Sequence, residues 1–598
     1  MDSKLIEINS DRLIPIEKHF RVSAGPGAGK TYWLVQHIKN VLHQSKRLEK
    51  ARKVACITYT NVAVETILNR LGNSVNQVEV STLHSFLYRH IIKPYATFLE
   101  NDFELNVTQM DGHEDTVVHF KKVKQWIENH PDAHLLKHPY TVNQLIKLKE
   151  NKVPLVRWLY HLNYRLNECG DIEIIGDNRK AYRIEMDGDK EERKCLSNSC
   201  LKTLSGDLLG YKKMYWSKGI IDHNDVLYFS YQLLKKYPFI SNVLRAKFPY
   251  LFIDEFQDTN PIQVEILKII GAEETIVGII GDEAQSIYGF QGADSSQFTS
   301  FSLPALTEFV MKDNRRSTNS IIDLLNIIRE DIKQNKYRDI QGDKPTLLIG
   351  KRMDAFSKAV EMGDKGNEIY SLSRDNITSN IMKKDLSQEI SNSKLIEELF
   401  EIDKPSISNK YRSNVVISCI RAAEYAREGD AKKAIKEIEG TLKDKPHKEE
   451  RRKLALKTLF LLLNKYDDYK DKSLYYFYSF IKNDIRPEIS KLGNGAPKKF
   501  YEDYDYKQLS ICVNFTDDKS KHRTIHKSKG EEFDNVLILL NSSDGMDIFT
   551  KPNLKDNEEH RIIYVALSRA RERIFINVPS IDNSIVEDLD ELFTIVHV

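Results

Sequence analysis

Short apolar runs alternate with longer amphipathic stretches along much of this chain. Apolar runs of four to eight residues bounded by polar or glycine positions predict buried strands, and apolar residues spaced three and four apart predict helices. In the first 95 residues, positions 54–58 and 78–81 fit strands, and positions 61–68 fit the helix between them. Strands interleaved with helices predict a parallel sheet, so the chain opens as an α/β protein.

The pattern changes twice further along. Residues 96–210 carry charged and aromatic residues at helical spacing, broken by hairpin-like polar stretches at 176–177 and 187–189, and predict a mainly helical insertion. The sheet is expected to resume at 222–227. A second Lys/Glu-rich helical insertion is predicted at about 385–510. Its residues 422–440 faintly resemble one tetratricopeptide-type repeat, but with no second copy a plain amphipathic helical hairpin is preferred.

The stretch LFIDEFQDTN at residues 251–260 is the central candidate for function in this pattern. An apolar run ends there in two adjacent carboxylates, Asp254 and Glu255. A buried strand that ends in an acid can present a magnesium ligand at the carboxyl edge of a parallel sheet. Taken alone, these acids are better explained by a buried strand that stops at a solvated turn.

A second stretch upstream decides between the two interpretations. A predicted strand at 20–23 is followed by a glycine loop and a helix that opens with a lysine and a threonine. The stretch comprises Ala24, Gly25, Pro26, Gly27, Ala28, Gly29, Lys30 and Thr31. Such a loop turns backbone N–H groups toward phosphate oxygens, while the lysine reaches the β/γ-phosphates and the threonine hydroxyl ligates Mg²⁺. The strict pattern begins with glycine where this chain has Ala24, so the match is to the looser form.

Composition and charge limit the classes of protein to consider. A chain of 598 residues is expected to form two to four domains, and 41% hydrophobic with 29% charged residues is ordinary for a globular protein. The net charge is only +2, so contacts with nucleic acid must come from local patches and stacking aromatic side chains. Six scattered cysteines, an N-terminus without an apolar signal core and no long apolar run predict a cytoplasmic protein without a membrane span.

Several stretches, in this order, resemble the UvrD/Rep/PcrA group of superfamily 1 helicases. The shared motifs are the phosphate loop and residues 58–61, 82–86, 254–258, 281–293, 314–317, 524–533 and 564–570. They cover the two α/β parts of the chain and are weak or absent in both insertions. Independent motifs that keep the family's order make the resemblance specific.

The resemblance implies an α/β fold with two RecA-like P-loop lobes, each a parallel sheet flanked by helices and each carrying a mainly helical insertion. The expected divisions are residues 1–95 and 211–305 for the first lobe (1A), 96–210 for its insertion (1B), 306–384 and 511–598 for the second lobe (2A), and 385–510 for its insertion (2B). The implied activity is ATP-dependent and Mg²⁺-dependent translocation in the 3′→5′ direction on single-stranded DNA, with unwinding of tailed duplexes.

The resemblance also assigns roles in ATP hydrolysis to residues of the first lobe. Lys30 would contact the phosphates, Thr31 and Asp254 would hold Mg²⁺, and Glu255 would position or deprotonate the attacking water. Gln285 would sense the γ-phosphate and connect it to the DNA-facing segment that follows. These roles match what phosphoryl transfer to water requires, namely charge compensation and an oriented nucleophile.

Three further roles fall on the second lobe. Arg316 and Arg569 would neutralise the γ-phosphate as charge develops, and Glu532 would bind the ribose. Because these residues belong to a different lobe, hydrolysis would require the lobes to close, which would couple chemistry to movement.

The same resemblance suggests contacts to DNA. The residues at those motif positions are Tyr59, Thr60, Asn61, His84, Phe86, Tyr288 and Phe290. Aromatic faces stack on any base and give a grip that is independent of sequence. Core packing is an equally good explanation for Phe86, whereas Tyr288 and Phe290 are better candidates because they alternate just beyond a polar turn. His84 could instead be a hydrogen-bonded structural histidine.

Two departures from the family pattern concern the adenine base. The family has an Asn-x-x-Gln element before the phosphate loop, and residues 8–20 contain no glutamine. The family also places an arginine after the loop threonine and a tyrosine in the later Asn-Tyr-Arg-Ser motif. Here those positions hold Tyr32 and Arg315, so we expect an arginine–aromatic sandwich in mirror order.

Two functions from different classes remain open. One is a DNA helicase and translocase acting in repair or replication. The other is an ATPase subunit that senses DNA ends or nucleotide and regulates a partner nuclease, as in the Gabija-type antiphage systems, whose helicase subunit is similarly compact. An inactive nucleotide-binding scaffold is disfavoured because every catalytic position is filled.

Overall fold

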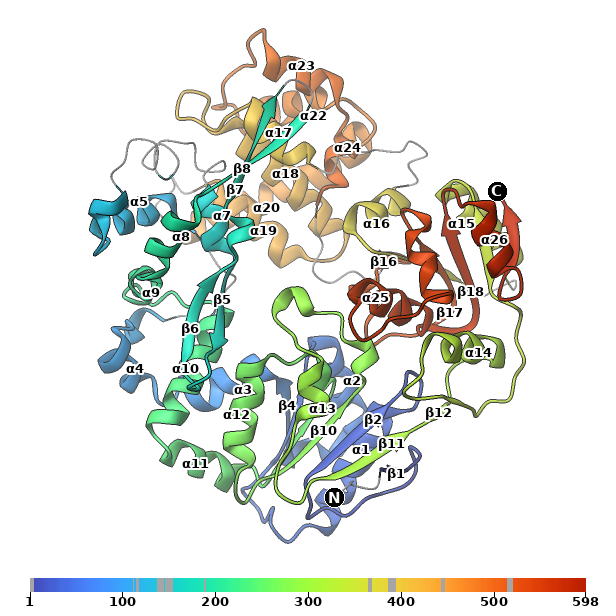
Figure 1. The fold of residues 1–598 in the computed structure, drawn as a ribbon. Helices are drawn as coiled ribbons and strands as arrows, with labels where there is room; N and C mark the ends of the chain where they lie inside the picture. The colour runs from blue at the N-terminus through green and yellow to red at the C-terminus, as the bar shows by residue number, and fades with distance from the viewer. Residues whose placement is uncertain are drawn as a thin grey trace. The chain divides into compact units, whose positions relative to one another are not determined.

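The computed structural model describes residues 5–110, 112–113, 118–136, 145, 154–187, 190–363, 368–384, 394–442, 447–513 and 520–598. Within these ranges the chain divides into two compact units, residues 1–315 and 316–598. Each unit is built around its own parallel sheet (Figure 1). The predicted polar hairpin at 187–189 lies partly outside the described residues.

The first unit contains a seven-stranded parallel sheet. Its strands are β1 (Ile6–Glu7), β2 (Phe20–Ala24), β3 (Val54–Thr58), β4 (Val78–Thr82), β9 (Tyr250–Ile253), β10 (Ile276–Gly281) and β11 (Thr307–Met311), in the order β1-β11-β2-β10-β9-β3-β4. Every residue of β3, β9 and β10 is buried. Near-continuous apolar runs of this kind are expected for parallel strands that are covered on both faces.

Helices cover both faces of this sheet. They are α1 (Lys30–Gln44), α2 (Asn61–Leu71), α3 (Leu83–Leu87), α10 (His223–Lys236), α11 (Phe239–Lys247), α12 (Pro261–Gly271) and α13 (Ser296–Ser300). Alternate residues of strand β9 contribute to the hydrophobic cores on the two faces of the sheet. Leu251 and Ile253 belong to the core shared with α3, α10 and α12, whereas Tyr250 and Phe252 belong to the core shared with α1 and α2. The strand that carries the motif carboxylates is therefore fixed from both sides.

Two sequence expectations differ from this fold. Residues 222–227 do not resume the sheet: they open helix α10, because Asp222 and Asp225 form a reciprocal capping box, with each backbone N–H donating to the other side chain at 2.9–3.0 Å. Strand β11, which the sequence analysis placed in the second lobe, pairs with β2 in the first sheet.

The insertion of the first unit combines helices with two hairpins. Its helices are α4 (Ala96–Phe103), α5 (Phe120–Asn129), α7 (Pro154–Tyr160), α8 (Asn198–Ser205) and α9 (Leu208–Trp216). Its antiparallel pairs are β5 (Leu162–Leu166) with β6 (Ile172–Gly176), and β7 (Tyr182–Asp187) with β8 (Lys190–Cys195). Trp126 of α5 and Trp158 of α7 lie in a core that they share with residues of α8 and α9.

The second unit contains a six-stranded parallel sheet in the order β16-β15-β17-β18-β14-β19. Its strands are β14 (Thr346–Ile349), β15 (Ile369–Ser373), β16 (His522–Thr524), β17 (Phe533–Leu539), β18 (Ala570–Val578) and β19 (Thr594–His597). The helices associated with it are α14 (Asn319–Ile328), α15 (Arg352–Met362), α16 (Asn376–Lys383), α25 (Glu558–Leu567) and α26 (Asn583–Leu589). Two large parallel sheets flanked by helices confirm the predicted α/β class with two RecA-like lobes.

In the described residues of the second unit's insertion, helices joined by loops and turns are accompanied by one isolated antiparallel bridge, between Ser473 and Asp505. Its helices are α17 (Leu395–Ile402), α18 (Arg412–Arg427), α19 (Ala431–Gly440), α20 (Lys448–Asn464), α21 (Tyr466–Tyr469), α22 (Leu474–Phe480), α23 (Ala496–Asp503) and α24 (Tyr506–Ser510). They enclose a separate hydrophobic core. Helices α18 and α19, which cover residues 422–440, pack against each other as consecutive helices.

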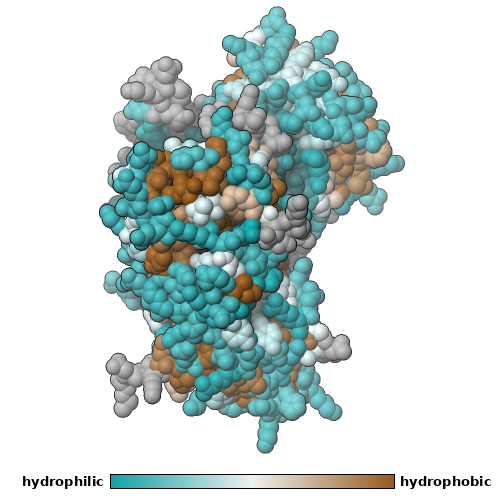
Figure 2. Space-filling view, turned by 90° about the vertical axis from the view of Figure 1, so that its right-hand side faces the viewer, coloured by the Kyte–Doolittle hydropathy of each residue, from teal (hydrophilic) through white to brown (hydrophobic). Residues whose placement is uncertain are grey.

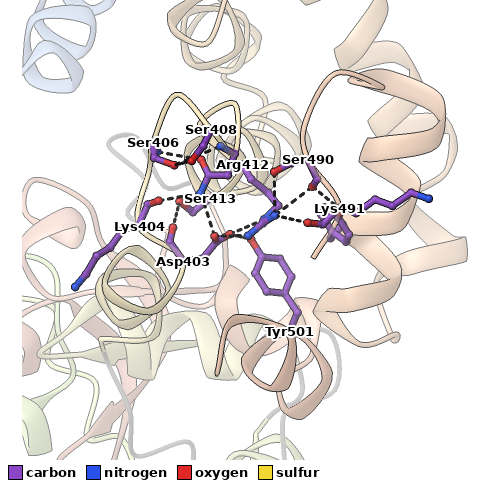
Figure 3. Close-up of polar contacts among 11 residues, drawn as sticks. Asp403, Lys404, Ser406, Ser408, Arg412, Ser413, Ser490, Lys491 and Tyr501 are labelled. Carbon is purple, nitrogen blue, oxygen red and sulfur yellow. Dashed lines mark hydrogen bonds and ion pairs between the residues drawn. The ribbon is translucent and has the colours of Figure 1, made fainter. Parts of the chain in front are cut away.

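A buried ion pair ties the helices of this insertion together (Figure 3). Arg412, at the start of α18, donates from Nε and a terminal nitrogen to the two carboxylate oxygens of Asp403, at 2.9 and 2.6 Å. Tyr501 of α23 donates its hydroxyl to the same carboxylate at 3.0 Å. The remaining terminal nitrogen of Arg412 donates to the backbone oxygens of Ser490 and Lys491. The network therefore joins three segments that are distant in sequence.

The surface carries scattered apolar patches. The face in Figure 2 is mainly hydrophilic and is interrupted by several separate hydrophobic areas. No helix in the described part of the chain has the length and apolarity needed to cross a membrane.

Candidate nucleotide-binding and DNA-binding site

The predicted phosphate loop connects β2 to α1. Gly27 and Gly29 have φ angles of +70° and +80°, in the left-handed region that favours glycine. A Cβ atom at Gly29 would also lie 3.0 Å from the Cβ atom of Ser10. Lys30 folds back over the loop and donates to the backbone oxygen of Ala24 at 3.2 Å. The loop therefore has the backbone conformation and the lysine that phosphate binding requires.

The predicted magnesium ligands lie side by side. Asp254 directly follows β9 and is 3% exposed, and its backbone N–H donates to Ile57 at 2.8 Å. The Thr31 hydroxyl donates to Asp254 Oδ2 at 3.3 Å, and the Glu255 backbone N–H donates to Oδ1 at 3.0 Å. Residues more than two hundred positions apart thus form one cluster of oxygen atoms beside the loop.

This donor set fits Mg²⁺. Magnesium prefers oxygen ligands and usually takes one or two from the protein and the others from water and substrate phosphates. No group of three or more His, Cys, Asp or Glu side chains in the described residues is arranged to hold a metal. Burial, assisted by the neighbouring Glu255 charge, raises the pKa of Asp254 to about 7, while Lys30 acts in the opposite direction. A cation would compensate this buried carboxylate.

Glu255 adopts an unusual backbone conformation. Its φ angle of +55° lies in the left-handed region, which non-glycine residues seldom adopt and which is often found at functional sites. The Gln257 side-chain nitrogen donates to Glu255 Oε2. The predicted catalytic carboxylate is therefore held by a specific neighbour.

Gln257 is a candidate functional residue to which the sequence analysis gave no role. Its side chain is fully buried, and its Oε1 accepts a hydrogen bond from the Asp282 backbone N–H at 2.9 Å. Its backbone oxygen accepts from the Ser286 hydroxyl at 3.0 Å. A Cβ atom at Gly281 would lie 2.5 Å from Gln257 Oε1, so glycine is needed for this approach. In the sequence, the position of Gln257 within the motif, two residues after the predicted catalytic acid Glu255, could have indicated this role.

Gln285 lies at the next step of the same network. Its side-chain nitrogen donates to Asp282 Oδ2. Asp282 thus connects Gln257, through its backbone, with Gln285, through its carboxylate. Hydrogen bonds therefore join Glu255 to the segment in which the sequence analysis placed the γ-phosphate sensor.

The two residues of the predicted adenine sandwich flank the loop. The Arg315 backbone N–H donates to Gly27 at 3.0 Å, and its guanidinium group donates to Asp11 at 2.6 Å. Tyr32, in the first turn of α1, is 44% exposed. Arg315 is thereby anchored beside the phosphate loop, and the sandwich itself stays a prediction.

Three of the predicted DNA-contacting aromatic residues form a ladder. Tyr59 and Tyr288 stack with ring centroids 4.7 Å apart and planes inclined by 30°. Tyr59 also donates its hydroxyl to Gln291 at 2.5 Å. Phe290 lies 6.0 Å from Tyr288 and is 67% exposed. An exposed aromatic ring on a packed aromatic base fits a stacking platform for nucleotide bases.

Of the other residues predicted to contact DNA, Thr60 caps a helix, Asn61 is exposed and Phe86 is buried. Thr60 caps helix α2, because its hydroxyl accepts a hydrogen bond from the Ala63 N–H at 3.2 Å, and Asn61 is exposed in the first turn. Phe86 is a core residue rather than a stacking residue: it is 1% exposed and packs 5.1 Å from Phe248. The apolar face of α3 takes it inward, so it cannot reach a base.

His84 belongs to a cluster of three histidines. Its ring lies 5.6 Å from that of His223 and 6.3 Å from that of His113. Burial, with the charges of the other two histidines, lowers the pKa of His84 to about 4. The ring is therefore neutral near pH 7, and its contact with DNA stays a prediction.

In the second unit, the three predicted site residues gather around Ser568. Arg316 Nε donates to Glu532 Oε2 at 2.6 Å, and its terminal nitrogen donates to the Ser568 backbone oxygen at 2.6 Å. Arg569 is 3% exposed and donates to Ser568 Oγ at 3.0 Å and to Val565 at 3.1 Å. Burial acts in the opposite direction, but the charge of Arg316 holds the pKa of Glu532 below its usual range.

Comparisons with known proteins agree with this geometry. The family model of the UvrD/REP helicase N-terminal domain matches residues 7–305, and that of the UvrD-like helicase C-terminal domain matches residues 313–580. The chain belongs to the UvrD-like helicase family. This assignment confirms the resemblance inferred from the motifs, and it makes the protein a member of an ATP-dependent DNA helicase family.

Several relatives of this UvrD-like helicase are similar over nearly the whole chain. The Gabija protein GajB of Bacillus cereus (strain HuB5-5) is 23% identical, with 96% of this chain and 95% of the relative covered. The ATP-dependent DNA helicase PcrA of Staphylococcus aureus (strain NCTC 8325 / PS 47) is also 23% identical, with 93% and 80% covered. A probable DNA helicase II homolog of Mycoplasma genitalium is 23% identical, with 95% and 84% covered.

Proposed function

We propose that this UvrD-like helicase couples ATP hydrolysis to 3′→5′ movement on single-stranded DNA and to the unwinding of tailed duplexes. The observation that carries the proposal is the hydrogen-bonded path from Glu255 through Gln257 and Asp282 to Gln285. The aromatic ladder of Tyr59, Tyr288 and Phe290 begins only three residues further along the chain. A change at the nucleotide can therefore be transmitted to a surface suited to DNA bases.

Each residue around the phosphate loop has a role in this proposal. Lys30 would exchange its hydrogen bond to Ala24 for one to the β/γ-phosphates, since an ionised acceptor makes the stronger bond. Thr31 and Asp254 would hold Mg²⁺, which compensates phosphate charge when bound. Glu255 would orient the attacking water and accept its proton, with its carboxylate held in position by the Gln257 side chain.

Arg316 and Arg569 supply the remaining charge compensation. In other phosphoryl-transfer systems an added arginine increases the rate by about 10³–10⁵-fold. Both arginines belong to the second unit, so turnover would depend on the two units coming together around the nucleotide. Glu532, held by Arg316, would bind the ribose, and the arginine–aromatic pair Arg315 and Tyr32 would bind the base.

The grip on DNA would come mainly from stacking. A net charge of +2 provides little general attraction for a polyanion. Stacking on an aromatic side chain contributes about 1–3 kcal/mol per base and tolerates any sequence. Phe290, exposed and supported by Tyr288, is the best-placed residue for this role.

A second candidate function is that of an ATPase subunit that senses DNA ends or nucleotide and regulates a partner nuclease in an antiphage complex. The similarity to the Gabija protein GajB favours it, because that alignment covers 95% of the relative, against 80% for PcrA. The same catalytic residues would serve this function, with the energy of hydrolysis used for signalling.

Assays of ATP turnover and strand displacement on purified protein separate the two functions. We expect single-stranded DNA to stimulate ATP turnover, and we expect duplexes with a 3′ tail to be unwound faster than duplexes with a 5′ tail. Unwinding only from a 5′ tail would reverse the proposed polarity. Stimulated hydrolysis without strand separation would support the sensor subunit instead.

A further inference from the structure

A basic pocket lies in the second unit, in and beside its helical insertion. It has a volume of about 430 Å³, within the range of small-molecule sites, which is roughly 300–1,000 Å³. Residues from the ends of α16, α18 and α20, from α21 and its flank, and from α24 line it. They are Lys383, Lys384, Arg427, Leu463, Tyr466, Asp467, Lys470 and Lys507. Five of these eight side chains are cationic and one is anionic.

Arg427 is fixed in one orientation on the wall of the pocket. Its guanidinium carbon lies 3.9 Å from the ring centroid of Tyr466, and a terminal nitrogen donates to the Tyr466 hydroxyl at 2.7 Å. A guanidinium group that stacks on an aromatic ring is pre-organised, so it loses little conformational entropy when it forms further hydrogen bonds. The planar fork of N–H donors matches the oxygens of a phosphate group.

A buried carboxylate behind the wall holds the neighbouring cation. Glu424 is 2% exposed and accepts hydrogen bonds from Lys384 Nζ at 2.7 Å and from the Tyr506 hydroxyl at 2.8 Å. Arg427 lies 3.8 Å from the same carboxylate. Burial lowers the pKa of Lys384 although Glu424 acts in the opposite direction. Lys384 and Arg427 therefore share one buried carboxylate.

Two further lysines of the pocket form ion pairs at its rim. Lys470 pairs with Asp467 at 2.5 Å, and Lys507 pairs with Asp471. Ion pairs near the surface contribute little to stability, so these lysines can turn toward a ligand at little cost. Asp467 and Asp471 are therefore the carboxylates paired with these two lysines, while Glu424 and Glu428 act on Lys384.

We propose that this pocket is a binding site for a phosphate-bearing ligand, with Arg427 and Lys384 as the fixed contacts and Lys470 and Lys507 as the movable ones. The size of the pocket suits a nucleotide or a short polyphosphate. All its residues belong to the second unit, and none of them takes part in the ATP site proposed above. The phosphate can come from a free compact anion or from the backbone of bound DNA.

The first arm of the test measures binding of a free anion to the protein. Equilibrium dialysis of radiolabelled tripolyphosphate would be performed on full-length protein that carries Lys30→Ala, which removes binding at the phosphate loop. We expect one remaining site, weakened at least tenfold by Lys470→Ala with Lys507→Ala. Lys465→Ala is the matched control, because Lys465 forms the same type of surface pair, with Asp468 at 3.0 Å, but does not line the pocket.

The second arm of the test measures binding of the protein to the DNA backbone. The slope of log K against log salt concentration for duplex DNA should decrease by about one for each phosphate contact that is lost. Loss of the tripolyphosphate site alone identifies a free ligand, and a reduced salt slope alone identifies DNA. If neither quantity changes in the double variant, or if Lys465→Ala changes them equally, the proposal is overturned. Arg427→Lys retains the charge but not the planar fork of N–H donors. It should also weaken the binding of tripolyphosphate or DNA, whichever the double variant affects.

Discussion

Gln257 accepts a hydrogen bond from the Asp282 backbone N–H at 2.9 Å through one end of its amide and donates to Glu255 through the other. An amide is suited to this position because it can donate and accept at once. Two motifs that are separate in sequence thus share one buried side chain. The Glu255 carboxylate, the proposed catalytic base, is thus linked to the segment that leads toward the aromatic ladder.

Gln257→Ala should uncouple hydrolysis from DNA. Without the amide, Glu255 loses its donor and the Asp282 N–H loses its acceptor, so we expect stimulation of ATP turnover by single-stranded DNA to fall about tenfold or more. Nucleotide affinity should change little, because Gln257 does not reach the phosphate loop. A stimulation ratio equal to that of the unsubstituted protein would contradict the coupling role. Buried unpaired groups also cost about 1–3 kcal/mol, so unfolding should be measured in parallel.

Glu255→Gln should retain ATP binding and lose turnover. The amide keeps the size of the side chain but cannot accept a proton, and general-base catalysis typically contributes about 10²–10⁴-fold. Steady-state turnover and nucleotide affinity measured on the same preparation would test this prediction. Glu265→Gln on α12 serves as the control, since Glu265 pairs with Lys268 and lies outside the site. Undiminished hydrolysis would remove Glu255 from its proposed role.

Phe290→Ala should weaken binding of single-stranded DNA without affecting stability. The loss of one stacked base corresponds to about 1–3 kcal/mol, which is roughly a tenfold to hundredfold change in affinity. Phe239→Ala is a matched control, because Phe239 is also an exposed phenylalanine of the first unit but lies on α11, away from the ladder. Equal affinities for the two variants would show that Phe290 does not stack on DNA.

His37 should make the first unit sensitive to acid. Its ring packs among Phe20, Trp33 and Phe252, and neither ring nitrogen has a hydrogen-bond partner in the described residues. Burial lowers the pKa of His37 to about 4. The folded state therefore resists a proton that the unfolded state accepts near pH 6.5, and stability is full above pH 6.5 and falls as the pH decreases toward 4. A difference of about 2.5 pKa units corresponds to about 3 kcal/mol.

The variant His37→Phe tests this account. It should flatten the dependence of the thermal midpoint on pH between about 6.5 and 4, as followed by scanning calorimetry, because phenylalanine has no proton to bind. His43→Gln, at an exposed position of the same helix, should leave the dependence unchanged. A pH profile of His37→Phe that coincides with that of the unsubstituted protein would assign the acid sensitivity to other groups.

The fold class and the core of the site could be predicted from sequence because both depend on local patterns. Buried parallel strands appear as continuous apolar runs, and the glycines of the loop are required by backbone angles that few other residues adopt. The strands and the loop are therefore decided within a few residues of the chain. The contact of Thr31 with Asp254 joins residues more than two hundred positions apart, and it agrees with the shared role that the family resemblance implies for them.

Other features depend on tertiary packing and could not be predicted in the same way. An aromatic residue in a DNA-contact motif has the same sequence appearance whether it points outward, as Phe290 does, or into the core, as Phe86 does. The segment at 222–227 was assigned to the sheet from its position, although its capping residues Asp222 and Asp225 were visible in the sequence. Gln257 and the basic pocket also depend on partners that are distant along the chain, such as Asp282 for Gln257 and Tyr466 for Arg427.

The buried pair of Asp403 and Arg412 leads to a prediction for the helical insertion. Removal of one partner leaves an uncompensated buried charge, which typically costs about 3–5 kcal/mol, so Asp403→Ala should strongly destabilise the insertion. The double variant Asp403→Leu with Arg412→Met should recover most of this loss, because a hydrophobic pair of similar volume needs no compensation. Lys465→Ala, which removes an exposed ion pair, should leave stability almost unchanged. Denaturant unfolding of the three variants would measure these differences. Equal destabilisation by the single and double substitutions would show that Arg412 acts through its contacts with Ser490 and Lys491 rather than through its charge.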